Sequence, residues 1–314
     1  MSKVVINKKF LSIFVAIFIV VIVLQFFGPK CQGKDVVINI EKGWGSIEAA
    51  DKLKAEHLIN SKWLFVLYVW LKGYNNRLQA GEYLLNTRMT IPQISKILAE
   101  GQTSPNWVKI TVPEGWTNKQ IEERLLKSGV IAVDSKLPKD QEGFLFPDTY
   151  YFYKNSSVET VTKKMQDNFD EKVNEEMKRE VKNQNKDLYD ILIMASILEK
   201  EVVSDEDRAI VSGIFWKRIK NNYPLESCAT IAYILGIEKK QYSYEDTRIK
   251  SPYNTYINLG LPPAPINNPG LSAIKAAIYP KQTDYNFFLS APDGKTIYSK
   301  TLEEHNANKA KYLQ

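Results

Sequence analysis

Histidine and cysteine are scarce in this chain of 314 residues, which contains only His57, His305, Cys31 and Cys228 of these types. A zinc site needs three or four well-placed His, Cys or carboxylate ligands, and no such cluster occurs in the sequence. Neither histidine lies beside a nucleophile-elbow motif, which argues against a Ser-His-Asp triad. Two cysteines are too few for a disulfide framework, although the sequence leaves open whether Cys31 and Cys228 form a single bridge. We therefore expect no metal, and if the chain is an enzyme we expect carboxylates to do its chemistry.

Phosphate-binding glycine motifs and strong charge are also missing. Neither a Walker loop nor a G-x-G-x-x-G fingerprint is present, so we expect no nucleotide cofactor. The formal net charge is +6, with 42 Lys and Arg against 36 Asp and Glu. These basic residues are dispersed, and we expect no nucleic-acid partner. A mildly basic exterior suits an anionic polymer or a membrane surface equally well.

One long hydrophobic run stands at the N-terminus. Residues 10–27 contain no charge, and a run of about 18 apolar residues is long enough to span a bilayer as a helix. Lys3, Lys8 and Lys9 precede the run, which predicts a cytoplasmic stub at 1–9. A cleaved signal peptide is the alternative, but the segment after Phe27 lacks the small-residue cleavage pattern. We expect a retained single-pass anchor in the cell membrane, with everything that follows outside the cytoplasm.

The sequence after the anchor predicts an α+β chain in three parts. Residues 36–106 read as a small α/β module, residues 107–140 as a connecting strand and helix, and residues 141–314 as a mainly helical domain with a C-terminal hairpin. The cluster of apolar residues at 63–71 indicates a core-facing helix in the first part. The expected strands are 36–40, 82–85 and 108–112. The expected helices are 46–57, 61–71, 90–100, 117–128, 157–182, 187–203, 205–221, 228–235, 272–279 and one from 301, and 242–270 is expected to be irregular.

The helix at 188–203 is the first candidate for chemistry. Apolar residues surround most of its circumference, which predicts burial, yet Glu199 and Glu201 lie near its C-terminal end. Desolvation and the negative end of the helix dipole both disfavour a charged carboxylate there. Both effects raise the pKa and would keep a carboxylic acid protonated, as a general acid requires. The alternative, that these are surface charges where the helix emerges into solvent, stays open on this evidence alone.

Two further stretches carry polar and aromatic groups. The loop 251–270 contains Tyr253, Asn254, Thr255 and Tyr256, followed by closely spaced prolines. Tyrosine faces can pack on sugar rings, and Asn and Thr can bond hydroxyl and N-acetyl groups. The stretch 143–150 contains one acid, Asp148, in an aromatic turn whose phenylalanines suit packing.

Together these stretches resemble the endolytic murein transglycosylases of the YceG-like family. The matching pieces are G-F-L-F-P-D-T-Y at 143–150, A-S-I-L-E-K-E at 195–201, and S-P-Y-N-T-Y with G-L-P-P-A-P-I-N-N-P-G between 251 and 270. The tail matches through 276–277 and 302–306. The long proline-glycine motif is specific, whereas the glutamate motif alone would be weak. The resemblance covers almost all of the chain beyond the anchor.

The resemblance implies a LysM-like module at 36–106 and a lysozyme-like catalytic domain at 141–314. It implies cleavage of the bond between N-acetylmuramic acid and N-acetylglucosamine inside nascent peptidoglycan strands, leaving 1,6-anhydromuramic ends. One glutamate would act as acid and then as base, with no cofactor. Glycan-polymerising synthases are implied as possible partners.

Glu199 and Glu201 compete for the catalytic role, because two residues at this spacing point about 200° apart on a helix. The second glutamate of the E-K-E motif corresponds to the acid of the broader transglycosylase pattern, so we select Glu201. The resemblance makes Glu199, Tyr253, Asn254, Thr255, Tyr256 and Asp148 supporting or substrate-binding residues.

The chain departs from the family pattern in two places. It reads L-E-S-C-A-T-I at 225–231 where members usually read L-Q-S-D-P-T-V, and Val202 follows the glutamate where Ser or Thr is usual. The first change puts in doubt any role of the lost Asp, and the second bears on how the catalytic carboxyl is hydrogen-bonded. Two other functions stay open: a membrane-anchored, non-catalytic wall-binding scaffold, and a hydrolase of the same bond.

Overall fold

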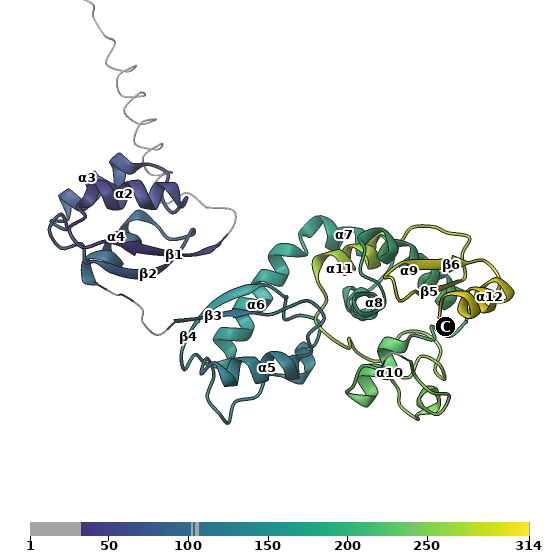
Figure 1. Cartoon of the computed structure of the whole chain (residues 1–314). Helices are drawn as coiled ribbons and strands as arrows, with labels where there is room; N and C mark the ends of the chain where they lie inside the picture. The colour runs from purple at the N-terminus through teal and green to yellow at the C-terminus, as the bar shows by residue number, and fades with distance from the viewer. Residues whose placement is uncertain (1–32, 102, 104–106, 240, 314) are drawn as a thin grey trace, which may run out of the picture. The chain divides into compact units, whose positions relative to one another are not determined.

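The computed structural model describes residues 33–101, 103, 107–239 and 241–313. The chain divides into two compact units, residues 1–109 and 110–314, and we describe each by itself (Figure 1). The expected stub and anchor at 1–27 lie outside the described residues, as does Cys31. Of the helices formed by the described residues, none is long and apolar enough to cross a membrane.

The N-terminal unit packs three helices against a two-stranded antiparallel sheet. Strand β1 (Asp35–Ile40) pairs with β2 (Gly81–Asn86), and the helices are α2 (Ser46–Ala55), α3 (Lys62–Leu71) and α4 (Ile91–Glu100). As the sequence predicted, α4 begins after Thr90 and ends before Gly101, which takes the left-handed conformation. The structure adds a capping box formed by Thr90 and Gln93. Helix α2 differs slightly, since Gly45 is its N-cap and Ser46 its first residue. A separate apolar core gives this unit its stability.

Helix α3 faces the core as predicted, but only with one side. Phe65 and Val69 are fully buried, but Trp63 and Trp70 keep 69% and 63% of their surface exposed. The unit therefore buries only one side of a helix that is apolar all round.

The C-terminal unit begins with a small sheet and a helix. Strand β3 (Trp107–Thr111) pairs with β4 (Thr149–Tyr153), and α5 (Asn118–Lys127) begins at a capping box formed by Thr117 and Gln120. A short 3-10 helix, η1 (Lys139–Gln141), leads into the aromatic stretch at 143–150. Strand β4 was not predicted from the sequence. Its alternating Tyr150 and Phe152 are buried, which gives the stretch a strand's periodicity.

The predicted helix at 157–182 is wrong as a single element. The structure has α6 (Val158–Lys172) and α7 (Glu175–Asn183), separated at Val173, whose ψ is 76°. Asn174 then caps α7 by accepting a hydrogen bond from the backbone of Met177. The Asn-Glu-Glu sequence at 174–176 is a helix start signal inside the predicted span.

Helix α8 (Leu188–Glu201) runs through the middle of this unit, as the sequence predicted for a helix apolar all round. Every residue from Ile191 to Leu198 is buried. Helices α7, α9 (Asp205–Lys220), α10 (Cys228–Leu235) and α11 (Leu271–Ile278) contact it. Asp187 caps its start by accepting a hydrogen bond from the backbone of Tyr189.

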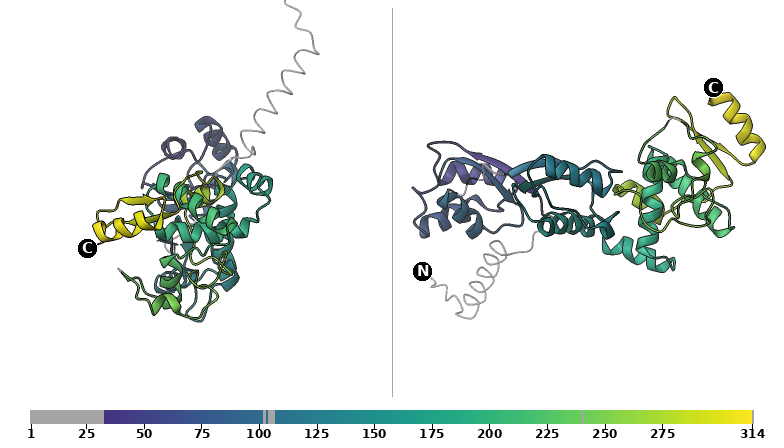
Figure 2. Two further views of the ribbon diagram at one scale, coloured as in Figure 1. Left: turned by 90° about the vertical axis from the view of Figure 1, so that its right-hand side faces the viewer. Right: turned by 90° about the horizontal axis from the view of Figure 1, so that it is seen from below.

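The end of the chain adds the predicted hairpin and helix. Strands β5 (Phe287–Ser290) and β6 (Thr296–Ser299) pair antiparallel, and α12 (Leu302–Tyr312) follows a capping box at Thr301. Figure 2 shows α12 at the opposite end of this unit from α5. The stretch 242–270 is irregular as predicted, except for η2 (Asp246–Arg248).

Candidate active site

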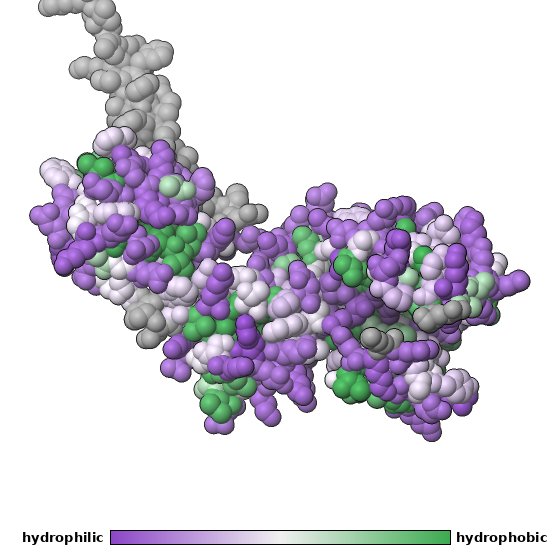
Figure 3. Space-filling model, in the orientation of Figure 1, coloured by the Kyte–Doolittle hydropathy of each residue, from purple (hydrophilic) through white to green (hydrophobic). Residues whose placement is uncertain are grey.

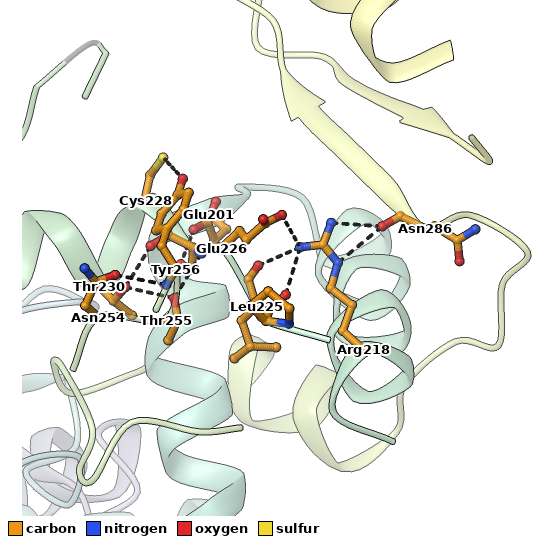
Figure 4. A network of polar contacts seen from close by, with 12 residues as sticks. Glu201, Arg218, Leu225, Glu226, Cys228, Thr230, Asn254, Thr255, Tyr256 and Asn286 are labelled. Carbon is orange, nitrogen blue, oxygen red and sulfur yellow. Dashed lines mark hydrogen bonds and ion pairs between the residues drawn. The ribbon is translucent and has the colours of Figure 1, made fainter. Parts of the chain in front are cut away.

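Glu201 is the last residue of α8 and lies against the start of α10. Its Oε1 atom accepts hydrogen bonds from the Ser227 hydroxyl and from the backbone N–H of Ala229, the latter at 3.3 Å. Val202 leaves the helix with extended backbone, so the carboxyl is presented where α8 ends. Figure 4 shows Glu201 among residues from two distant segments, 225–230 and 254–256.

Burial dominates the electrostatics of Glu201. Desolvation raises the pKa of its carboxyl, while the hydrogen bonds from Ser227 and Ala229 and the positive charge of Arg218 partly oppose the rise. The carboxyl thus favours its neutral form more than an exposed glutamate does, yet the Ser227 hydroxyl and the Ala229 N–H can stabilise its charged form. This combination suits a group that gives up a proton and takes one back.

The loop at 251–256 holds Ser227 in place. The Ser227 N–H donates to Thr255 Oγ1 at 3.0 Å, and the Thr255 carbonyl accepts from the backbone of Glu226 at 3.1 Å. The hydroxyls of Thr230 and Thr255 also lie 3.0 Å apart. A chain of hydrogen bonds therefore runs from Glu201 through Ser227 to Thr255, and it fixes the start of α10.

Asn254 and Thr255 are placed differently from what the sequence suggested. They are 0% and 2% exposed, so neither side chain is accessible to a sugar in this structure. Asn254 Nδ2 donates to the carbonyls of Thr247 and Ile249, and its Oδ1 accepts from the backbone of Tyr256. These two residues order the loop and do not form a surface for binding.

Tyr253 and Tyr256 are only partly buried. The Tyr253 ring lies 4.9 Å from the Tyr233 ring, centroid to centroid. The Tyr256 hydroxyl lies 3.1 Å from the Cys228 sulfur, and Cys228 is a free thiol next to Ser227. Burial raises the pKa of the Cys228 thiol, which makes it a weak nucleophile. The two tyrosines keep the aromatic surface that a sugar could contact.

The Glu199 carboxylate points away from Glu201, and both of its oxygens have partners. Its Oε1 atom forms an ion pair with Arg208 Nη2 at 2.7 Å, and its Oε2 accepts from the Gly270 N–H at 2.8 Å. The Glu199 side chain is 7% exposed. It therefore links α8 to α9 and to the start of α11, and the structure separates it from the group around Glu201.

Asp148 also lies apart from that group. Its carboxylate accepts from the backbone of Thr149 at 2.7 Å and from Asn168 Nδ2 at 3.1 Å. Both partners belong to the β4 and α6 region, so Asp148 fastens β4 to α6. Among the described residues, no group of three or more His, Cys, Asp or Glu could hold a metal ion.

Sequence reasoning missed two groups beside Glu201. One is Ser227 with the Ala229 N–H. The other is Arg218, 9% exposed, which donates to the carbonyls of Leu225 at 2.7 Å and Asn286 at 3.0 Å and lies 3.6 Å from Glu226. Arg218 thereby fixes the segment before α10. A single basic residue inside a helix gave no signal in the sequence, whereas the unusual L-E-S-C-A-T-I stretch did.

Comparison with known proteins decides the family. The model of the YceG-like family matches residues 38–311. The chain belongs to the YceG-like family. The resemblance seen in the sequence is thereby confirmed.

Individual YceG-like proteins match over most of the chain. An endolytic murein transglycosylase of Bacillus subtilis is 35% identical over an alignment of 308 residues, and the match covers 88% of this chain and 85% of that protein. One from Streptococcus pneumoniae serotype 2 is 29% identical over 89% of this chain and 59% of its own length. The crystal structure of a YceG-like protein from Listeria monocytogenes is 32% identical, with a TM-score of 0.58, and covers 88% of this chain and 100% of that one.

The departure of this YceG-like chain from the usual L-Q-S-D-P-T-V pattern falls on the site. The Ala229 N–H that donates to Glu201 stands where the pattern has proline, and proline has no N–H to donate. Ala229 therefore supplies Glu201 with a backbone donor that a proline at this position could not supply.

Proposed function

We propose that this chain is an endolytic murein transglycosylase, a lyase that cleaves the bond between N-acetylmuramic acid and N-acetylglucosamine within nascent peptidoglycan strands. Membership of the YceG-like family and the activity named for the Bacillus subtilis relative support the reaction class. The observation that carries the assignment to a residue is the environment of Glu201. It is a buried carboxyl with a raised pKa at the end of a central helix.

In this proposal Glu201 acts first as an acid. Its neutral carboxyl donates a proton to the glycosidic oxygen as the bond from that oxygen to C1 of the muramic acid breaks. The Ser227 hydroxyl and the Ala229 N–H then stabilise the carboxylate that forms.

Glu201 acts next as a base. The C6 hydroxyl of the same muramic acid attacks C1, and the carboxylate takes the hydroxyl proton. One C1–O bond is exchanged for another, Glu201 recovers its proton, and no water is consumed. The product ends in 1,6-anhydromuramic acid, and a single carboxyl suffices for both steps.

The other residues have supporting roles. We assign Tyr253 and Tyr256 to contact with the sugar, because their rings are only partly buried. Thr255 and Asn254 act as positioning residues through Ser227 and the loop. Glu199 stabilises the end of α8 through Arg208, and Asp148 enters no step of the reaction.

Location and assembly complete the proposal. Residues 10–27 would anchor the chain in the cell membrane, with both units outside the cytoplasm. The N-terminal unit would be a LysM-like module and the C-terminal unit a lysozyme-like catalytic domain. Peptidoglycan strands are the substrate, and peptidoglycan synthases are the proposed partners.

Product analysis tests the reaction class. Purified peptidoglycan is incubated with the protein, and the released fragments are examined by mass spectrometry. We expect internal cleavage with 1,6-anhydromuramic ends. Reducing ends in their place would make the protein a hydrolase, and binding without cleavage would make it a wall-binding scaffold.

A further inference from the structure

Helix α3 carries an exposed apolar face on the side away from its own core. Trp63, Leu67, Trp70 and Leu71 are 69%, 49%, 63% and 66% exposed. Their spacing of four, seven and eight residues places them on one stripe about 100° wide. We call these four residues the α3 face. Figure 3 shows hydrophobic surface over α3 on the N-terminal unit.

The composition of the segment around the α3 face fits a lipid surface. Between Glu56 and Glu82 the chain contains no acidic residue, whereas Lys62, Lys72 and Arg77 lie within it. Lys62 pairs with Asp51 at 2.7 Å, but Lys72 and Arg77 are exposed. Tryptophan prefers the boundary between lipid and water, and basic residues beside it attract anionic headgroups.

The length of the connection to the anchor adds a geometric argument. Seven residues, 28–34, separate the uncharged run from the start of β1 at Asp35. Fully extended, they span at most about 25 Å. If residues 10–27 cross the bilayer, the N-terminal unit is therefore held close to the membrane surface.

We propose that the α3 face inserts into the headgroup region of the bilayer in which the chain is anchored. The inference rests on the membrane anchor of the proposed function, but not on its chemistry. Docking through α3 would fix the orientation of the N-terminal unit at the membrane, which the short connection at 28–34 alone does not do.

A lipid surface fits the α3 face better than a glycan strand does. Sugar sites combine aromatic rings with carboxylate, amide or hydroxyl groups that bond the sugar hydroxyls, and the four side chains of the α3 face offer none of these. Leu67 and Leu71 gain from transfer into lipid and have no comparable use against a sugar.

Quenching of tryptophan fluorescence tests the proposal on the full chain. The protein is reconstituted into phosphatidylcholine vesicles containing phosphatidylglycerol, with lipids brominated near the top of the acyl chains. Flotation of the vesicles shows first whether the chain is membrane-anchored. We expect the bromine atoms to quench the wild type, and the Trp63→Phe/Trp70→Phe variant to lose most of that quenching. Trp44→Phe, in the same unit, is the matched control and should lose little.

A second variant keeps both reporters. Leu67→Gln/Leu71→Gln leaves Trp63 and Trp70 in place and alters only exposed positions, so circular dichroism should show a folded unit. We expect it to lose most of the quenching as well. A floating wild type that is not quenched, or a quenched signal that neither double variant changes, would overturn the docking. Protection of Trp63 and Trp70 from aqueous acrylamide by purified glycan strands, with no quenching by lipid, would assign the face to glycan and also overturn it.

Discussion

At the scale of single residues, two opposing influences meet on the Glu201 carboxyl. Burial favours the neutral acid, and the hydroxyl of Ser227 favours the carboxylate. Because Glu201 must be protonated to donate its proton to the glycosidic oxygen, the rate should fall as pH rises through the pKa of Glu201. This fall in rate is the alkaline limb of the pH profile. Its position therefore depends on the hydrogen bonds that Glu201 accepts, including the one from Ser227.

We expect Ser227→Ala to move the alkaline limb of kcat/KM to higher pH, because it removes a donor that lowers the pKa of Glu201. The maximal rate should fall about tenfold, the effect of one hydrogen bond to a charged group. Ser196→Ala is the matched control, since it removes a buried hydroxyl from α8 that bonds Ile193 and Ile266. A limb that stays in place in Ser227→Ala, or that moves in Ser196→Ala, would contradict this account of Ser227.

The sequence identified Glu201 and the loop at 253–256 as candidates, but not Ser227 or Arg218. The helix that ends at Glu201 is apolar nearly all round, and that pattern is local, so it can be read from consecutive residues. Ser227 and Arg218 approach the site from positions 26 and 17 residues further along the chain. Their roles depend on how α9 and α10 pack, which no local pattern records.

At the scale of elements, Glu142 fastens the start of α5 to the loop before α11. Its carboxyl accepts from the backbone of Asn118 at 2.9 Å and from Asn268 Nδ2 at 3.3 Å. Asn268 also accepts from the backbones of Gly143 and Leu145. Burial raises the pKa of Glu142 from 4.5 to about 7, against the backbone hydrogen bond from Asn118, which lowers it.

This pKa shift makes stability depend on pH. The folded state binds the proton more tightly than the unfolded state, so the contribution is complete below pH 4.5 and is lost as pH rises to about 7. We expect Glu142→Gln to keep both accepted hydrogen bonds and to remove this dependence. Above pH 7 it should exceed the wild type in free energy of unfolding, by on the order of 3 kcal/mol at most. Urea denaturation at several pH values measures the difference.

Glu123→Gln, at an exposed position on α5, is the control for Glu142→Gln and should leave the pH dependence of the wild type intact. Equal slopes of stability against pH in wild type and Glu142→Gln would mean that the carboxyl is not the titrating group.

Helix boundaries were predictable where capping signals are local. The sequence placed helix starts at Thr90, Thr117 and Thr301, and the structure has a capping box at each of them. Strand β4 was not predicted because its pairing with β3 joins residues about forty apart in the chain. Pro147 and Asp148, directly before β4, also made the aromatic stretch at 143–150 resemble a turn.

At the scale of the whole molecule, each unit has its own apolar core. One core is built from residues between 38 and 98, and the other from residues between 146 and 278. The sequence predicted a small α/β part and a larger helical part, and comparison with the Listeria monocytogenes structure supports a YceG-like fold over 88% of the chain.

Separate cores predict separate unfolding transitions in calorimetry. Leu53→Ala, in the first core, should lower one Tm by roughly 10 °C or more and leave the other unchanged. Leu192→Ala, in the second core, should do the reverse. A single transition that both variants lower equally would show that the two units unfold as one.

The most direct test of the central claim compares two glutamates two residues apart. Wild type, Glu201→Gln and Glu199→Gln are incubated with purified peptidoglycan, and 1,6-anhydromuramic ends are counted by mass spectrometry. We predict that Glu201→Gln lowers their rate of formation about a hundredfold or more, the weight of a general acid. Glu199→Gln should lose far less, since it changes an ion pair with Arg208. Full activity in Glu201→Gln, with loss only in Glu199→Gln, would contradict the assignment of the catalytic acid.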